Sequence, residues 1–211
     1  NKMVYSGNPL RADILAASAN ASTDQANQSE CNILILGGSL GASVLNELLP
    51  QVLAELAQQV KPLTIRVHHQ TGVNDIDAVR SAYAALACEV EAVAFIDDMV
   101  SAYQRADVVV ARAGALTISE LACFGLNAVL VPYPHAIDNH QEINARWLSD
   151  KGLARLIVQR DLNQQRLFDA LCVEVRDVQG RAERSRELKA IARRDAVTLI
   201  AAEVKRCVNG E

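Results

Sequence analysis

The first residues with recognisable chemistry are the glycines of GGSLGA (37–42), which follow the apolar run NILIL (32–36). Glycines there allow a tight turn and let a phosphate approach backbone N–H groups at a helix start. The helix dipole adds a favourable potential for an anion. The spacing is neither the GxGxxG fingerprint nor a P-loop, because no Lys-Ser or Lys-Thr pair follows. A turn needed only for strand-to-helix packing explains the glycines equally well.

A second segment of Gly and small residues, RAGALTISE (112–120), follows the apolar run DVVVA (107–111). It predicts a second phosphate site at a helix start. Thr117 and Glu120 also have the spacing of a capping box, with Thr as N-cap and Glu at N3, and spacing alone favours this structural role. In the functional interpretation, the two oxygens of Glu120 accept hydrogen bonds from the cis hydroxyls of a ribose.

Polar groups also gather in VPYPHAIDNHQ (131–141), after another apolar run. Two prolines fix an extended segment, and the side chains of His135, Asp138, Asn139, His140 and Gln141 then converge near a helix start. Amide and imidazole groups of this kind suit the hydroxyls of a sugar. Asp138 or Asn139 is alternatively the helix N-cap. A metal site is a weaker interpretation, because one carboxylate and two His at i, i+5 are poor ligand spacing.

Two further segments occupy strand ends. FIDDM (95–99) offers Asp97 and Asp98 as an acidic pair, but adjacent side chains point in different directions, and one acid suits the N-terminus of the following helix. HQTG (69–72) fits a loop or a pocket floor, and we interpret it as structural.

Alternating strands and helices must position these segments. The apolar runs predict strands at 32–36, 63–68, 92–96, 107–111, 128–132 and 155–158. Helical periodicity predicts helices between them, at 42–59, 75–87, 98–105, 116–124, 138–151 and 163–174. This order predicts an α/β fold, a Rossmann-like open parallel sheet with helices on both faces. Ligands of such sheets bind at the carboxyl ends of the strands. Residues 16–30 have the composition of a linker, and 180–206 predict one long helix.

Composition narrows the class of protein. The chain has 211 residues, 50% of them apolar, and a formal charge of −4, which argues against disorder and against nucleic-acid binding through a broad basic face. No apolar run approaches the ~18–20 residues of a membrane span. Five separated cysteines without a CxxC pair indicate reduced cytosolic thiols and no zinc site. Because the chain starts at Asn1, we expect a piece of a longer protein.

Together and in this order, GGSLGA, HQTG, FIDDM, ADVVVARAGALTISEL and LVPYPHAIDNHQEINA closely resemble the carboxyl-terminal half of the MurG family. SGNPLR (6–11) resembles that family's crossing between its two domains. The family consists of UDP-N-acetylglucosamine transferases that complete the lipid-linked disaccharide precursor of peptidoglycan. The resemblance implies the C-terminal domain of a GT-B glycosyltransferase. It implies three parts: the end of the first domain and the linker (1–30), the UDP-GlcNAc-binding domain (31–178), and a C-terminal helix (179–211) that packs toward the first domain.

The resemblance also implies roles for individual residues. Gly38, Ser39, Gly41 and Thr117 would touch the diphosphate, and Ala115 and Leu116 would offer it backbone N–H groups. Ile96, through its backbone, Met99 and Arg11 would lie at the uracil, Glu120 would bind the ribose, and His140 and Gln141 would face the GlcNAc hydroxyls. Leu40 replaces a Gln that is often found in the family, which removes one polar contact, and His140 stands where some members have Gln.

The implied activity is inverting, metal-independent transfer of GlcNAc from UDP-GlcNAc to the muramyl 4-hydroxyl of lipid I, giving lipid II. No residue here matches the expected base, which the family carries on its first domain together with its membrane-docking patch. The intact enzyme would lie at the cytoplasmic face of the inner membrane, with no nucleic-acid partner, and this chain alone would be inactive. The alternatives are a UDP-GlcNAc 2-epimerase, another GT-B enzyme or a non-catalytic nucleotide-binding module.

Overall fold

A six-stranded parallel sheet forms the centre of the molecule, with the strand order β3-β2-β1-β4-β5-β6. The computed structural model describes residues 4–20, 29–38, 42–84, 86 and 88–209. The strands are β1 (Glu30–Leu36), β2 (Thr64–Gln70), β3 (Glu89–Val93), β4 (Val108–Ala111), β5 (Asn127–Leu130) and β6 (Arg155–Leu156). The apolar strands β1, β4 and β5 occupy the middle of the sheet, where both faces are covered. The predicted open parallel sheet is confirmed.

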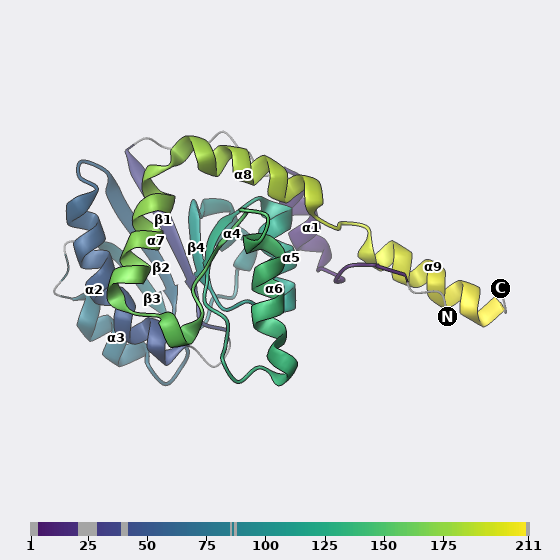
Figure 1. Cartoon of the computed structure of the whole chain (residues 1–211), viewed down its shortest axis with the longest axis horizontal. Coiled ribbons are helices and arrows are strands. Elements are labelled where there is room, and N and C mark those ends of the chain that lie inside the picture. The colour runs from purple at the N-terminus through teal and green to yellow at the C-terminus, as the bar shows by residue number, and fades with distance from the viewer. Residues whose placement is uncertain (1–3, 21–28, 39–41, 85, 87, 210–211) are drawn as a thin grey trace.

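Helices cover both faces of this sheet (Figure 1). On one face, an apolar core joins the strands to α2 (Ser43–Gln59), α3 (Ile76–Tyr83) and α7 (Gln164–Arg176). The core on the other face contains residues of α1 (Ala12–Ala19), α4 (Met99–Arg105), α5 (Ala115–Phe124), α6 (His140–Ser149) and α8 (Val178–Ile191). Short 3-10 turns, η1 (Ile137–Asn139) and η2 (Gln159–Asp161), precede α6 and α7. Within the described ranges, no helix is long and apolar enough to cross a membrane.

The edge strand β3 lies three residues earlier than the predicted strand 92–96. Its sequence EVEAV places Glu89 and Glu91 opposite Arg66 and His68 of β2, on a half-exposed part of the sheet. Polar residues at an edge strand lack the continuous apolar pattern of a buried strand. Phe95 and Ile96 therefore follow the strand and belong to the loop at its carboxyl end.

The predicted single helix at 180–206 is wrong, because the chain breaks between α8 and α9 (Ala196–Asn209). Ala192 has extended backbone angles, φ −66° and ψ 131°. The guanidinium of Arg194 donates to the carbonyl oxygen of Cys123 at 2.7 Å, which ties this break to the end of α5. The predicted linker at 16–30 is also corrected in part, since α1 continues to Ala19; residues 21–28 of that prediction lie outside the described residues.

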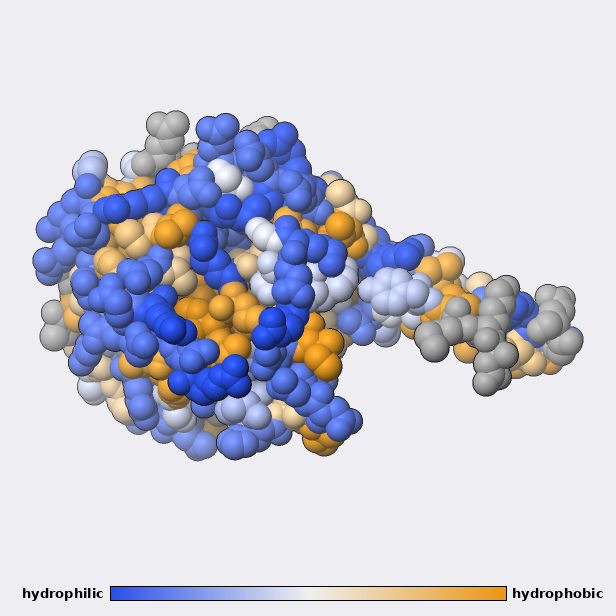
Figure 2. Space-filling view, in the orientation of Figure 1, coloured by the Kyte–Doolittle hydropathy of each residue, from blue (hydrophilic) through white to orange (hydrophobic). Residues whose placement is uncertain are grey.

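The segment around Gly7 runs beside the start of α9, and the two project from the body together (Figure 1). Gly7 has φ +80°, and a Cβ there would lie 2.7 Å from Cβ of Arg193, so a larger residue does not fit. Arg193 also lies over the ring of Tyr5, 5.3 Å from its centroid. Figure 2 shows apolar surface along this projection. The exposed apolar residues of α9 are Val197, Ile200, Val204 and Val208.

Candidate functional site

The loop after β1 begins with Gly37-Gly38 at the carboxyl edge of the sheet. Gly38 has φ +85°, a conformation that favours glycine, and a Cβ on it would meet nothing within 4 Å. Its backbone therefore borders open space, as a phosphate-binding turn requires. The predicted contacts at Ser39 and Gly41, and the departure at Leu40, lie outside the described residues.

The start of α5 differs from the predicted capping box. The N-cap is Gly114, with φ −63° and ψ 147°, and no side chain in the described part of the chain caps this helix end. Thr117 and Glu120 therefore lie in the first and second turns of the helix, and the capping-box prediction for them is wrong. The first backbone N–H groups of a helix have no partner within it, so those of Ala115, Leu116 and Thr117 can bind an anion.

Glu120 lies half-buried between α5, α4 and α1. Its Oε2 accepts a hydrogen bond of 2.8 Å from the phenol of Tyr103 on α4. Burial raises the pKa of the carboxyl group, and the Tyr103 bond and the charge of Arg11 partly oppose this rise. Arg11 is the N-cap residue of α1 and forms an ion pair with Asp13 at 3.5 Å. The structure thus brings Arg11 near Glu120, two predicted site residues that are far apart in the sequence.

Gln70 connects the ends of three strands. Its amide Nε2 donates to the carbonyl of Gly38 at 3.0 Å, while its Oε1 accepts from the backbone N–H of Ile96 at 3.2 Å. The Ile96 N–H is thereby used within the protein, and its carbonyl is the backbone group left for a ligand. Met99, the first residue of α4, is partly buried against the same core. HQTG (69–72) therefore has the structural role that we expected, and Gln70 also supports two predicted site residues.

The acidic pair after β3 serves the next helix. Asp98 is the N-cap of α4, and its carboxylate accepts from the backbone N–H of Ser101 at 3.0 Å and from its hydroxyl at 2.6 Å. These bonds lower the pKa of Asp98. The helix-start role of one acid is confirmed, and a paired acid–base role is not supported by this arrangement.

The polar loop before α6 is held by its own side chains. Nδ1 of His140 lies 2.7 Å from the carbonyl oxygen of Ile137, and Oε1 of Gln141 accepts from the backbone N–H of Tyr133 at 3.0 Å. Since a carbonyl only accepts, Nδ1 of His140 carries a proton, and in the neutral ring Nε2 is left as an acceptor. The amide nitrogen of Gln141 is left as a donor. The pair can therefore offer one acceptor and one donor to a ligand.

Asn139 occupies the N-cap position of α6 in the left-handed conformation, with φ 53°, but its side chain does not cap the helix. Its amide nitrogen donates instead to Glu142 at 3.1 Å. The preceding Asp138 is also left-handed, with φ 51°. Among the residues that the structure describes, no group of three or more His, Cys, Asp and Glu side chains is placed to hold a metal ion.

Three polar residues at this edge had no role in the sequence predictions. Arg112 is half-buried and donates to the carbonyl oxygens of Val131 and Pro132 at 3.0 and 3.1 Å, which anchors the polar loop to the end of β4. Asn144 on α6 donates to the carbonyl of Ala113 at 3.1 Å. Both residues lie inside motifs in which the sequence assigned site roles to neighbouring residues only.

The third is Asn46, which lies on the buried face of α2. Its amide nitrogen donates to Thr71 O at 2.9 Å and to Asp75 at 2.7 Å, and its Oδ1 lies 3.0 Å from Nε2 of His69. An Asn among the leucines of an apolar helix face was a signal that could have identified it, because buried polar groups need partners.

Comparisons with known proteins identify the family of this chain and relatives with a similar sequence. The sequence model of the glycosyltransferase family 28 C-terminal domain matches residues 32–200. A UDP-N-acetylglucosamine--N-acetylmuramyl-(pentapeptide) pyrophosphoryl-undecaprenol N-acetylglucosamine transferase from Paraburkholderia xenovorans (strain LB400) is 41% identical over 98% of this chain and 56% of its own length. The transferase of the same name from Azoarcus sp. (strain BH72) is 46% identical over 81% of this chain and 47% of its own length.

Among solved structures, that of Acinetobacter baumannii MurG superposes with a TM-score of 0.81 at 33% identity, over 92% of this chain and 55% of that one. A glycosyltransferase of kitacinnamycin, at 22% identity and a TM-score of 0.65, shares the fold. The chain spans about half the length of the curated relatives that it matches. The family match covers most of the chain, and the chain therefore belongs to glycosyltransferase family 28, as a C-terminal domain of that family.

Proposed function

We propose that this chain is the donor-binding part of an inverting transferase that moves GlcNAc from UDP-GlcNAc to the muramyl 4-hydroxyl of lipid I. The names of the relatives, which are N-acetylglucosamine transferases, support this choice of reaction. The observation that carries the proposal is the uncapped start of α5, with the carboxylate of Glu120 on the same helix. Glu120 follows Thr117 by three residues, roughly 5 Å along the helix axis. One nucleotide can span that distance, with its diphosphate at the helix start and its ribose at the carboxylate.

The remaining predicted residues are assigned to the donor as the resemblance implies. The loop of Gly38, with Ser39 and Gly41, would contact the diphosphate. For the uracil, the carbonyl of Ile96 would accept from the N3–H group, because the Ile96 N–H already donates to Gln70. Met99 and Arg11 would lie beside the base, and His140 and Gln141 would bind the sugar hydroxyls.

The chemistry proposed for this part of the enzyme is stabilisation of the leaving group. When the acceptor hydroxyl attacks C1 of GlcNAc, negative charge develops on the departing UDP. Backbone N–H groups and the dipole of α5 are fixed before the reaction and stabilise that charge without reorganising. We propose that no metal is required, and that the base that accepts the proton lies in the first domain of the intact protein.

The same proposal assigns the parts of the chain and their partners. Residues 1–30 end the first domain and form the linker, 31–178 bind UDP-GlcNAc, and 179–211 lead back toward the first domain. The apolar residues Val197, Ile200 and Val204 of α9 support this last assignment, because they form one face that is exposed in the described part of the chain. Lipid I and the cytoplasmic face of the inner membrane would contact the first domain. The product would serve peptidoglycan synthesis, and through it cell shape and division.

Replacement of Glu120 tests this assignment. Glu120→Ala should weaken UDP binding by roughly 1–3 kcal/mol, because it removes a charged acceptor of the ribose hydroxyls. Titration calorimetry gives the affinity, and a melting curve of the same samples gives the stability. Unchanged UDP affinity in a folded variant contradicts the ribose assignment, whether or not its melting temperature falls.

A further inference from the structure

The phenol of Tyr103 is the buried partner of Glu120. The tyrosine is 2% exposed, and its ring packs against Phe124, with 5.2 Å between the ring centroids. Its hydroxyl lies 2.8 Å from Oε2 of Glu120. A tyrosine enclosed in this way keeps one rotamer, so its hydroxyl is a fixed point beside a carboxylate on a different helix.

Glu120 has two carboxylate oxygens and a flexible side chain, so how well it binds a diol depends on the contacts that fix the carboxylate. In the part of the chain that the structure describes, the Tyr103 phenol is the one hydrogen-bond donor to this carboxylate. It engages Oε2, which accepts with more than one lone pair, and Oε1 remains available. A carboxylate held at one oxygen loses less freedom when a ligand binds than one that is mobile.

The Tyr103 phenol is always the donor of its hydrogen bond to Glu120. Burial first, and then the charge of Glu120, raise the pKa of Tyr103 well above its ordinary value, so the hydroxyl keeps its proton and remains a donor. Glu120 must then be the acceptor, and a protonated Glu120 is not needed for the contact. The pair presents an acceptor to the ligand.

We infer that Tyr103 is a positioning residue that orients the Glu120 carboxylate for the vicinal diol of a nucleoside diphosphate, and that it thereby sets the preference for ribose over deoxyribose. The inference rests on the proposed function, since it requires a nucleotide at this edge. Tyr103 acts through Glu120 and does not itself contact the nucleotide.

The test compares UDP with 2′-deoxy-UDP by titration calorimetry on the whole chain. The wild type should prefer UDP. Tyr103→Phe keeps the ring and removes only the hydroxyl, so it should weaken UDP binding by roughly three- to tenfold, the range of one hydrogen bond. Binding of 2′-deoxy-UDP should change by less than about twofold, because one hydroxyl of the diol is missing. The preference for UDP therefore shrinks.

A matched variant separates positioning from a general loss of packing. Tyr83→Phe removes a buried phenol that contacts His69 at 2.9 Å on the opposite face of the sheet, and it should leave the preference unchanged. Adding Tyr103→Phe to Glu120→Gln should not weaken UDP binding further, because the charged carboxylate is already gone. Melting curves establish that each variant is folded at the assay temperature.

The outcomes distinguish the inference from the proposal beneath it. Wild-type preference for UDP that persists in Tyr103→Phe overturns the positioning role and leaves the donor site standing. Equal binding of UDP and 2′-deoxy-UDP by the wild type overturns both the ribose assignment and the role of Tyr103. No binding of either nucleotide to the folded wild type overturns the proposed function itself.

Discussion

His69 shows how a buried polar residue at this sheet edge is satisfied. Its side chain is fully buried; Nδ1 lies 2.9 Å from the hydroxyl of Tyr83, and Nε2 lies 3.0 Å from Oδ1 of Asn46. Burial lowers the pKa of the imidazole to about 4. His69 is therefore neutral at pH 7 and holds α2 and α3 to the end of β2.

This burial predicts a loss of stability in mild acid. The unfolded chain binds the proton of His69 near its ordinary pKa of 6.5, whereas the folded chain binds it near 4. Stability from this group is thus complete above about pH 6.5 and is lost as the pH falls toward 4, by about 3 kcal/mol. The measurement is the free energy of unfolding of the wild type and of His69→Gln between pH 7 and 4. Parallel pH profiles of the two proteins would contradict the prediction.

At the residue scale, the sequence identifies candidate site residues better than it identifies the residues that hydrogen-bond to them. Glu120 was singled out from its place after a strand and from the family resemblance. Its partner Tyr103 was not, because a contact between two helices depends on how both pack on the sheet. The capping-box prediction failed for a related reason: the N-cap of α5 is Gly114, in the short connection that follows β4, and not the Thr that the spacing favoured.

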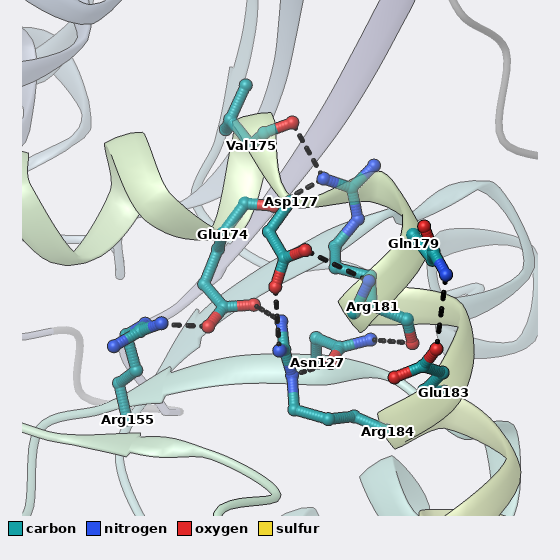
Figure 3. A network of polar contacts seen from close by, with 10 residues as sticks. Asn127, Arg155, Glu174, Val175, Asp177, Gln179, Arg181, Glu183 and Arg184 are labelled. Carbon is teal, nitrogen blue, oxygen red and sulfur yellow. Dashed lines mark hydrogen bonds and ion pairs between the residues drawn. The ribbon is translucent and has the colours of Figure 1, made fainter.

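The corner between α7 and α8 is held by a network of charges (Figure 3). Glu174, whose side chain is 3% exposed, forms ion pairs with Arg155 and Arg184, each at 2.7 Å. Arg184 also pairs with Asp177 at 3.0 Å, and Asp177 caps α8 at the N–H of Gly180. The buried guanidinium of Arg181 donates to the carbonyls at the end of α7, those of Glu174 and Val175.

Because Glu174 is buried, loss of one partner leaves a charge without full compensation. Arg184→Met should lower the free energy of unfolding by about 2–4 kcal/mol, toward the lower part of the range for a broken buried pair, since Arg155 remains. Arg186→Met, an exposed arginine of the same helix, is the control and should change it by less than about 0.5 kcal/mol. Urea denaturation measures both. Equal effects of the two substitutions would show that the buried network does not stabilise the corner.

At the element scale, periodicity predicted the strands of the sheet and most helices. Buried strands appear in the sequence as apolar runs, and amphipathic helices appear as apolar residues at helical spacing. The break between α8 and α9 was not predicted, since it depends on the contacts of Arg193 with the segment at Gly7 and of Arg194 with the end of α5. Such long-range contacts leave no local period in the sequence.

At the scale of the whole molecule, an acidic chain is proposed to bind an anion. Its formal charge is −4, yet the candidate site offers helix N–H groups and a glycine turn in place of a broad basic face. In the proposal, these fixed dipoles would bind a diphosphate through local geometry, which the net charge of the chain does not describe. The helix α9 projects from the body (Figure 1), and the chain spans about half the length of the curated relatives that it matches.

Titration of the folded 211-residue chain with UDP-GlcNAc and UDP by calorimetry tests the central claim most directly. We expect saturable binding of both ligands at a stoichiometry near one, since the residues proposed to contact the diphosphate, ribose and base all belong to this chain. The same sample should not transfer GlcNAc to a lipid I analogue, because the base is assigned to the first domain. No heat of binding for either ligand, in a sample shown by its melting curve to be folded, would contradict a donor site built from these residues.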